Sequence, residues 1–158
     1  MPSLRPAVVE DQAFLLDLTS RLAAFDVPPW RTPREITRGD DEILLAALHD
    51  PTADTLILVA LDEAGERAGY VFASTKTDYF TRERHAHVEV LAVRKEHEGQ
   101  GFGRLLLDAA ETWARERGDR FITLNAFEKN TRARAVYERL DYLPETIHYR
   151  KGLGEPAE

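Results

Sequence analysis

The chain has 158 residues, 43% of them hydrophobic, and contains no cysteine. This length fits one domain with a single core, and the lack of cysteine excludes disulfides, thiolate metal ligands and a cysteine nucleophile. The formal net charge of −7 argues against nucleic acid or an anionic membrane as the main partner, because both bind basic surfaces.

Hydrophobic periodicity and turn residues predict two helices and three strands in the first half of the chain. The second helix is the clearest, because Thr32, Pro33 and Glu35 have the spacing of a capping box with proline at the first helical position. The first helix carries its apolar side chains on one face. The expected elements are a strand near Leu4–Arg5, helices over residues 11–25 and 33–49, and strands at Thr55–Leu61 and Ala68–Thr77.

The second half predicts strands and helices in alternation, which indicates one α/β domain over residues 1–158 with antiparallel strands at one side. The chain shows no repeat, no long linker, no signal peptide and no apolar stretch near the roughly 20 residues that span a bilayer, so we expect a soluble, cytoplasmic protein. The expected elements are a strand at His87–Val93, a helix at Arg104–Arg117 ending at Gly118, a strand at Phe121–Ala126, a helix at Thr131–Leu140 and a final strand or hairpin from Tyr142 to Lys151.

A glycine-rich turn follows the strand that ends at Val93. Residues 98–106 read Glu-Gly-Gln-Gly-Phe-Gly-Arg-Leu-Leu, and the three glycines allow positive φ angles and close approach of a ligand. The helix start supplies unpaired N–H groups and a partial positive charge, and Arg94, Lys95 and Arg104 add local positive potential. Together these features favour a bound phosphate or pyrophosphate, although such turns also occur as plain connections.

A second motif lies further along the chain, where Asn130 suits an N-cap and Asn130, Ala133 and Tyr137 share a helical face. With the glycine turn, it resembles the GNAT superfamily of acyl-CoA N-acyltransferases, whose pyrophosphate turn is Arg/Gln-x-x-Gly-x-Gly/Ala and whose later helix carries Asn-x-x-Ala-x-x-x-Tyr. The resemblance extends over nearly the whole chain. Two positions depart from the family pattern, since Glu98 stands where Arg or Gln is usual and Asp141 where Gly is usual.

The resemblance implies a single-domain α/β (α+β) fold with a mixed, mostly antiparallel sheet of about six or seven strands and about four helices. It also implies acetyl-CoA (coenzyme A), whose pantetheine arm would pair with Leu91–Val93 opposite Asn125, with Leu91 as a backbone oxyanion donor. A bulge would free these groups, but the apolar run also fits an unbulged strand. The residues assigned to the cofactor are Leu91, Ala92, Val93, Glu98, Gly99, Gln100, Gly101, Phe102, Gly103, Arg104, Asn125, Asn130, Ala133 and Tyr137.

The family mechanism is direct attack of a primary amine on the thioester in a ternary complex, and the lack of cysteine is consistent with it. An alkyl ammonium with a pKa of about 10 is mostly protonated near neutral pH, so a general base helps. Glu89 is the candidate base, because it is the only acidic residue in the run Val88–Val93. The alternative is that Glu89 faces solvent or pairs with a neighbouring arginine. Glu128 is the reserve candidate. Tyr137 is the candidate acid for the leaving thiolate, the alternative being a core tyrosine.

The acceptor pocket of the resembled family is formed by the first two helices, their connection and later loops. Here these segments carry Phe25, Asp26, Trp30, Tyr79 and Phe80, and Glu89 is also assigned to the acceptor site. Aromatic side chains beside an acid suit a cationic amine, either a small molecule or a peptide N-terminus. Trp30 equally fits a residue that caps the core beneath a loop. Homodimers are common in the family.

Two other functions are open. His85, His87 and Glu89 alternate along a strand and point to one face, as in the metal site of a metal-dependent enzyme, but no fourth ligand is evident and no metal is assigned. Two surface histidines are the plainer interpretation, and the same row could line an acceptor pocket. The second alternative is a non-catalytic acyl-CoA-binding or regulatory domain that keeps the cofactor site without the chemistry.

Overall fold

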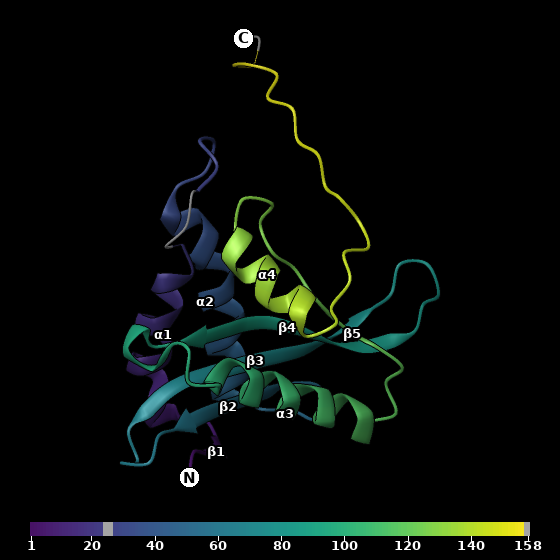
Figure 1. Ribbon diagram of the computed structural model, residues 1–158. Coiled ribbons are helices and arrows are strands. Elements are labelled where there is room, and N and C mark those ends of the chain that lie inside the picture. The colour runs from purple at the N-terminus through teal and green to yellow at the C-terminus, as the bar shows by residue number, and fades with distance from the viewer. Residues whose placement is uncertain (24–26, 157–158) are drawn as a thin grey trace.

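The computed structural model describes residues 1–23 and 27–156. One five-stranded sheet, in the order β1-β2-β3-β4-β5, is flanked by helices (Figure 1). The strands are β1 (Ser3–Pro6), β2 (Leu56–Leu61), β3 (Arg67–Thr77), β4 (Arg84–Val93) and β5 (Ile122–Leu124). The helices are α1 (Gln12–Thr19), α2 (Pro33–His49), α3 (Phe102–Glu116) and α4 (Thr131–Arg139), with 3₁₀ helices at Val9–Asp11, Ser20–Ala23 and Lys95–His97. In the described part of the chain, no helix has the length and apolar character needed to cross a membrane.

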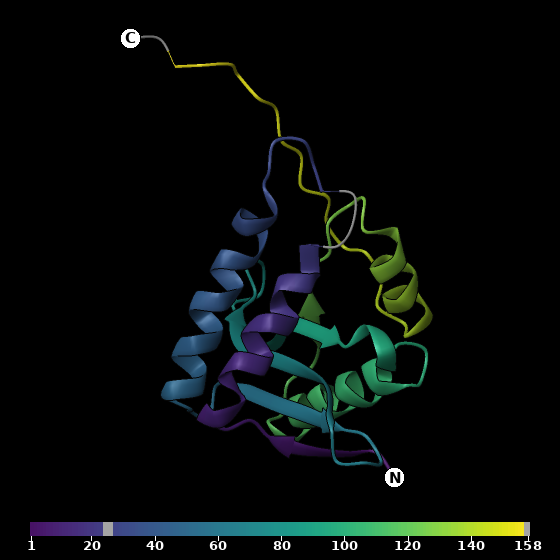
Figure 2. The ribbon, with the colours of Figure 1, turned by 90° about the vertical axis from the view of Figure 1, so that its left-hand side faces the viewer.

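The sheet separates two hydrophobic clusters, so helices cover both of its faces (Figure 2). The cluster on the α1 and α2 face contains Leu15, Leu18, Leu44, Ala47, Leu48, Val59, Tyr70, Phe72, Val90 and Ala92. The cluster on the α3 and α4 face contains Ala60, Ala68, Val71, Val88, Phe102, Leu106, Leu107 and Ala110, with Tyr137 and Leu140 packed against it. Burial on both faces explains the apolar runs Ala68–Ala73 in β3 and Val90–Val93 in β4.

The capping box predicted for the second helix is confirmed. Thr32 Oγ1 accepts a hydrogen bond from Glu35 N at 3.2 Å, and Glu35 Oε1 accepts one from Thr32 N at 3.3 Å. The first helix is shorter than predicted, because the regular α-helix ends at Thr19 and a 3₁₀ turn continues to Ala23. The rest of its predicted span lies outside the described residues.

The sheet is mixed and mostly antiparallel, as predicted. Strands β1 to β4 pair antiparallel, whereas β5 pairs parallel with β4 over only three positions, from Ala86 opposite Ile122 to Val88 opposite Leu124. The predicted strand at Phe121–Ala126 is therefore cut short at Leu124. Among the described residues, the end of β5 leaves the second half of β4 without a strand on that side.

Two expectations about strands are wrong. The sheet of the described residues has five strands, fewer than the six or seven implied by the resemblance. The predicted final strand or hairpin at Tyr142–Lys151 is absent, because residues 143–156 contain no helix or strand. In Figure 1 this segment leaves α4 and projects from the body, so its backbone meets no neighbouring strand. A strand-like pattern does not by itself form a strand, because the segment must also pair with a neighbouring strand.

Candidate active site

The glycine turn has the conformation that an anion site needs. Gly99 and Gly101 have φ angles of +76° and +88°, in the left-handed region that favours glycine, and Gly101 is the N-cap of α3. Gly103, which was expected to share this freedom, lies inside α3 without a positive φ, because the helix begins at Phe102. A Cβ on any of the three would meet nothing within 4 Å, so the space beside the turn is open.

The start of α3 adds backbone donors to the turn. The N–H of Leu105 bonds to the carbonyl oxygen of Gly101 at 3.0 Å, so the N–H groups of residues 102–104 come before the first hydrogen bond of the helix. The partial positive charge of a helix start lies at the same place. Arg104 is exposed and lies 4.0 Å from Asp108, one turn further along α3. The turn therefore presents mainly backbone N–H groups, rather than side chains, to an anion.

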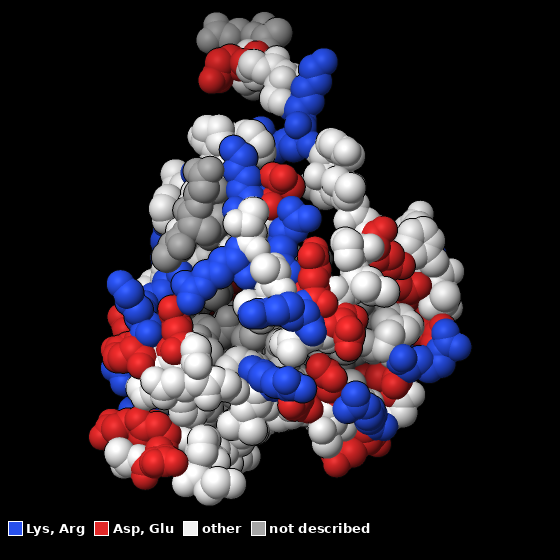
Figure 3. Space-filling view, in the orientation of Figure 1, with Lys and Arg blue, Asp and Glu red and all other residues white. Residues whose placement is uncertain are grey.

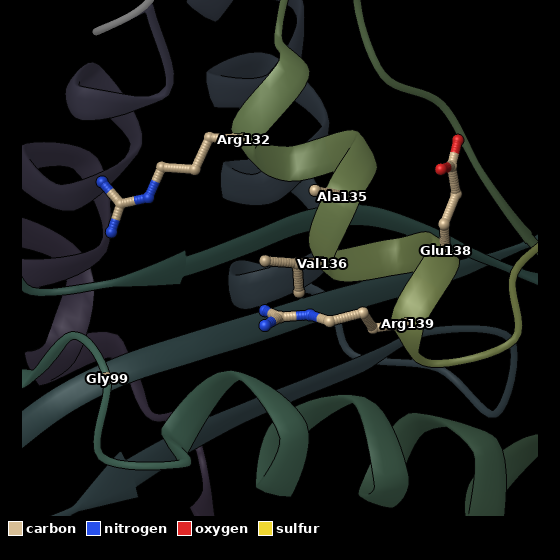
Figure 4. A pocket seen from close by; sticks show the side chains of 6 residues that line it. All are labelled: Gly99, Arg132, Ala135, Val136, Glu138 and Arg139. Atoms are coloured by element: carbon tan, nitrogen blue, oxygen red, sulfur yellow. The ribbon is translucent and has the colours of Figure 1, made fainter.

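A pocket of about 700 Å³ lies between the glycine turn and α4 (Figure 4). Arg132 and Arg139 extend from α4 on the side of Gly99, whereas Glu138 points away. The two arginines are two turns apart and share a helical face. Sequence reasoning missed both of them, although this spacing was a readable signal. The remaining lining residues are Ala135 and Val136.

The departure at Glu98 has a basic partner. Glu98 Oε2 accepts a hydrogen bond from Arg132 Nη2 at 2.7 Å, which joins the turn to the first part of α4. The carboxylate that stands in place of Arg or Gln is thus paired with a guanidinium from another element. Its negative charge is offset beside the anion site.

Strand β4 carries a bulge at Glu89. Phe72 of β3 lies opposite Val90, whereas the next residue, Ala73, lies opposite Val88. Glu89 is therefore an extra residue in the ladder, and the alternation of faces shifts by one position. Val88 joins the cluster beneath α3, and Val90 joins the one beneath α1 and α2. The bulge lies where the pairing of β4 with β5 stops.

Beyond the bulge, β4 has free backbone groups on its β5 side. Arg94 N donates to Ala68 O at 2.8 Å, which fixes the phase of the antiparallel ladder. By the alternation of such ladders, Ala92 bonds to β3, while the amides of Leu91 and Val93 point to the opposite side. This is the edge predicted for the pantetheine arm. Asn125 is exposed just after the end of β5.

Glu89 lies on the α2 face of the sheet with a side chain that is 11% exposed. Its Oε1 accepts a hydrogen bond from Ser74 Oγ at 2.7 Å and lies 3.0 Å from Lys76 Nζ. It also lines a pocket of about 350 Å³ between α2 and the sheet, together with Ile43, Ala46, Ala47, Asp50, Thr52, Thr55, Phe72, Ser74, Thr75 and Lys76. The carboxylate is thus neither solvated nor paired with an arginine, and it faces a cavity.

A second carboxylate, Asp40 of α2, lies near Glu89. Partial burial raises the pKa of Asp40 to about 6, and the negative charges of Glu89 and Asp41 add to the effect. Asp41 leaves Oδ1 buried without a hydrogen-bond partner among the described residues. The α2 side of the pocket region therefore carries an acidic electrostatic environment, which favours a cationic guest.

His85 and His87 are not surface residues, because they are only 5% and 8% exposed. Thr123 Oγ1 of β5 lies 3.1 Å from His85 Nε2 and 2.7 Å from His87 Nδ1. Burial lowers the pKa of His87. No group of three His, Cys, Asp or Glu side chains in the described ranges is arranged to hold a metal ion. The two histidines hold β4 and β5 together just before the split, and the metal-site interpretation has no support.

Tyr137 is partly buried on α4 and packs against the cluster beneath α3. Burial raises the pKa of its phenol, and its ring centroid lies 6.2 Å from that of Tyr142. Asn130 caps α4 as predicted, since its Oδ1 accepts a hydrogen bond from Ala133 N at 3.3 Å. Glu128, the reserve base, is exposed in the preceding loop.

The chain matches the model of a known protein family. The family model described as "Acetyltransferase (GNAT) family" matches residues 17–142, which include the bulge, the glycine turn and α4. The chain belongs to the GNAT family of acetyltransferases. A comparison with curated protein sequences finds no match.

Solved acetyltransferase structures share this GNAT fold over almost the whole chain. A proposed acetyl transferase from Pyrococcus furiosus is 24% identical, with a TM-score of 0.76 over 97% of this chain and 100% of that one. A glucosamine-6-phosphate N-acetyltransferase from Arabidopsis thaliana is 18% identical, with a TM-score of 0.66 over 97% and 99%. An aminoglycoside antibiotic 6'-N-acetyltransferase from Acinetobacter baumannii is 16% identical, with a TM-score of 0.71 over 98% and 100%. At these identities the likeness shows the fold alone.

The aromatic residues expected at the GNAT acceptor pocket do not gather there. Tyr79 and Phe80 lie at the tip of the β3–β4 hairpin and are 76% and 72% exposed. Trp30 precedes α2 and is half-exposed, with the Arg150 guanidinium 5.1 Å from its ring centroid. The hairpin tip and the loop before α2 are far apart in Figure 1. Phe25 and Asp26 lie outside the described residues.

Proposed function

We propose that this GNAT chain transfers an acetyl group from acetyl-CoA to a primary amine by direct attack while both are bound. One observation carries the proposal. The bulge at Glu89 places a carboxylate that is only 11% exposed at the point where β4 loses its β5 partner. A proton acceptor and free backbone donors therefore lie next to each other along one strand, which is what amine acylation requires.

The residues around the glycine turn fit coenzyme A. The open space at Gly99 and Gly101 and the start of α3 suit the pyrophosphate, and Arg132 and Arg139 would add positive charge from α4. The free amides of Leu91 and Val93 would pair with the pantetheine arm. The further contacts proposed are Ala92, Glu98, Gln100, Phe102, Gly103, Arg104, Asn125, Asn130 and Ala133.

Bound acetyl-CoA would supply the thioester whose carbonyl carbon the amine attacks. Glu89 would accept the proton that the ammonium group loses, with Oε2 available because its two contacts in the described chain use Oε1. The N–H of Leu91 would donate a hydrogen bond to the thioester oxygen. Tyr137 would donate a hydrogen bond to the departing sulfur, whose conjugate thiol has a pKa of about 8.5, below that of a phenol.

The pocket beside Glu89 supports a small cationic amine or a peptide N-terminus as acceptor. Ile43, Ala46 and Phe72 give it apolar walls, while Glu89 and Asp50 supply carboxylates. Lys76 lies 3.0 Å from Glu89, so an incoming ammonium would replace one cation with another at this carboxylate. The same ion pair favours the second candidate, a non-catalytic acyl-CoA-binding domain, if the amine cannot displace Lys76.

A calorimetric titration with acetyl-CoA, followed by assays with a panel of primary amines, tests the proposal. We expect saturable binding that Gly101→Glu weakens at least about a hundredfold, because the added side chain fills the open space and repels phosphate. Gly118→Glu is the matched control, since Gly118 also has a positive φ of +85° and open surroundings but ends α3 at its other end. Released coenzyme A thiol can be measured directly, because the chain has no cysteine. Binding without release for every amine would favour the second candidate, and absence of binding would overturn both.

A further inference from the structure

A lysine occupies the candidate base in the pocket between α2 and the sheet. Lys76 Nζ lies 3.0 Å from Glu89 Oε1, and both residues line this pocket. A simple amine that binds Glu89 gains little, because it replaces one cation by another and leaves the Lys76 ammonium without its partner. An acceptor that also carries an anionic group leaves neither charge unpaired. The ion pair therefore favours an acceptor of mixed charge.

The ion pair lies in line with the position proposed for the thioester. In the register of β3 with β4, Leu91 lies opposite Val71, and Lys76 lies opposite His85. The bulge at Glu89 falls between these two positions along β4. The carboxylate of Glu89 therefore lies between the backbone donor proposed for the thioester oxygen and the ammonium of Lys76. An amine at Glu89 has the thioester on one side and a cation on the other.

The rest of the pocket suits a small organic group beside these two charges. Ile43 of α2 and the buried Phe72 of β3 supply apolar surface, and the volume is about 350 Å³. Ser74 Oγ donates a hydrogen bond to Glu89 Oε1 at 2.7 Å, which orients the carboxylate. Asp50 also lines the pocket, but it is exposed at the end of α2, where water screens its charge. Lys76 and Glu89 are therefore the charges closest to a bound amine.

The surface of the protein carries charges of both signs. On the face that Figure 3 shows, acidic and basic side chains are interspersed, although the net charge of the chain is −7. Such a face does not present a broad potential of one sign. Opposite charges at short range then contribute more to the choice of a small ligand than the net charge does.

We propose that the acceptor is a free α-amino acid, whose ammonium group binds Glu89 and whose carboxylate binds Lys76. The zwitterion inserts into the ion pair, so each charge of the protein exchanges its partner for an equivalent one. A simple amine and a peptide N-terminus lack a carboxylate beside the amine. This inference rests on the proposed function, because it names the acceptor class for the same site.

The transfer itself is the one proposed for a primary amine. The amino nitrogen forms a bond to the acetyl carbon, and the carbon–sulfur bond of the thioester breaks. One proton of the ammonium group goes to Glu89 and a second to the departing sulfur. The products are an N-acetyl amino acid and the coenzyme A thiol.

Acceptors that differ only in the carboxylate test the proposal. Leucine, phenylalanine and lysine are each compared with the amine left by decarboxylation and with the amino acid amide, by release of coenzyme A thiol. We expect kcat/KM of the best amino acid to exceed that of both its analogues by at least about tenfold, because only the amino acid pairs both charges. The amide has a lower amine pKa than the amino acid and the decarboxylated amine a higher one, so a preference over both excludes an effect of basicity.

Substitution of Lys76 should move the two kinds of acceptor in opposite directions. Lys76→Met removes the partner of the carboxylate and also the cation that competes at Glu89. We expect kcat/KM to fall about tenfold for the amino acid and to rise about threefold for the decarboxylated amine. Lys76→Arg should keep the preference, and Lys151→Met, in the exposed tail, is the matched control. A merely structural role of Lys76 would lower both values alike, which would overturn the proposal.

The same compounds separate failure of this inference from failure of the proposed function. Turnover of the amines without a preference for any amino acid would overturn the acceptor class and leave the transferase in place. If no compound releases coenzyme A, calorimetric titration of the coenzyme A complex with the same compounds is the second measurement. Binding of an amino acid that Lys76→Met weakens would support the acceptor class without the transfer. Equal binding of amino acid and amine, or no binding of either, would overturn the inference.

Discussion

Two neighbouring regions of the sheet differ in how closely they are packed and in how fully their polar atoms are paired. One is the ladder between β3 and β4, and the other is the split between β4 and β5. In the ladder, a Cβ on Gly69 would lie 2.5 Å from the carbonyl oxygen of Ala92. Asp11, which bonds to β1 and β3, is fully buried and accepts hydrogen bonds on both oxygens. At the split, both contacts of Glu89 use one oxygen, and in the glycine turn after β4 a Cβ on Gly101 would meet nothing within 4 Å. In the β3–β4 ladder the space is occupied and the polar groups are paired, which stabilises the fold. Around Glu89 and the glycine turn, space and polar atoms remain available, and there we propose that the chain binds its ligands.

In the closely packed region around the β3–β4 ladder, removal of the Asp11 carboxylate should cause the largest loss of stability. Its carboxylate lies 2.7 Å from Arg5 Nη1 and 2.8 Å from Arg67 Nε, and it also accepts a hydrogen bond from Val8 N. We expect Asp11→Ala to lower the free energy of unfolding by about 4 kcal/mol, because two guanidinium groups and a backbone donor lose their partner. Denaturant unfolding measures this, with the exposed neighbour Glu10→Ala as control. A loss equal to that of the control would contradict the structural role.

The stability that this network contributes should depend on pH. The Arg5 hydrogen bond holds the pKa of Asp11 well below its usual range. Because the folded pKa is below the unfolded one, the stabilisation is present above about pH 4 and is lost as the pH falls through the folded pKa. The difference in stability between the wild type and Asp11→Ala should therefore shrink on acidification.

Substitution of Gly69 should give the next largest loss of stability, and Gly103 provides a direct comparison. Gly69→Ala should cost about 3 kcal/mol, because the nearest atom is backbone of β4 and the strands must separate. Gly103→Ala should be neutral or stabilising by up to about 1 kcal/mol, since alanine suits a helix and nothing lies within 4 Å. Thermal unfolding of both variants is the measurement. Similar stabilities would show that β3 and β4 adapt to the added methyl group.

The sequence predicted most elements and the glycine turn, because these depend on local signals. Thr32 and Glu35 cap α2 through neighbours in sequence, and Gly101 takes the left-handed conformation that its turn demands. The bulge at Glu89 was not predictable. Residues on both faces of β4 are buried, so a shift in alternation leaves no break in the apolar pattern.

Features that depend on distant parts of the chain were missed for a related reason. The pair of Glu98 with Arg132 joins two elements that only the folded sheet brings together. The aromatic residues expected at the acceptor site do not lie together, because the sequence does not fix where a loop lies in the fold, as the exposed Tyr79 and Phe80 show. The strand expected at Tyr142–Lys151 is absent, because a strand forms only where the segment pairs with a neighbour, and the local pattern does not fix that pairing.

At the split between β4 and β5, Glu89→Gln should lower kcat about a hundredfold and leave the Kd of acetyl-CoA unchanged. Glutamine keeps the shape of glutamate but cannot accept the proton. Steady-state kinetics with an amine found in the panel, together with calorimetry, measures both. Glu128→Gln is the control, since Glu128 is exposed in the loop before α4. A larger loss in the control than in Glu89→Gln would move the base to Glu128.

Asp40→Asn should give the smallest effect and the opposite sign to Asp11. Burial raises the pKa of Asp40 to about 6, so its charged form destabilises the fold as the pH rises from about 4 through 6. Because the side chain is partly solvated, we expect the variant to be more stable by only about 1 kcal/mol at pH 7.5, and equal to the wild type below about pH 4. The exposed Asp17→Asn controls for the charge change. In a Glu89→Gln background the gain should shrink, since the charge of Glu89 contributes to the cost; an unchanged gain would mean that the two carboxylates act independently.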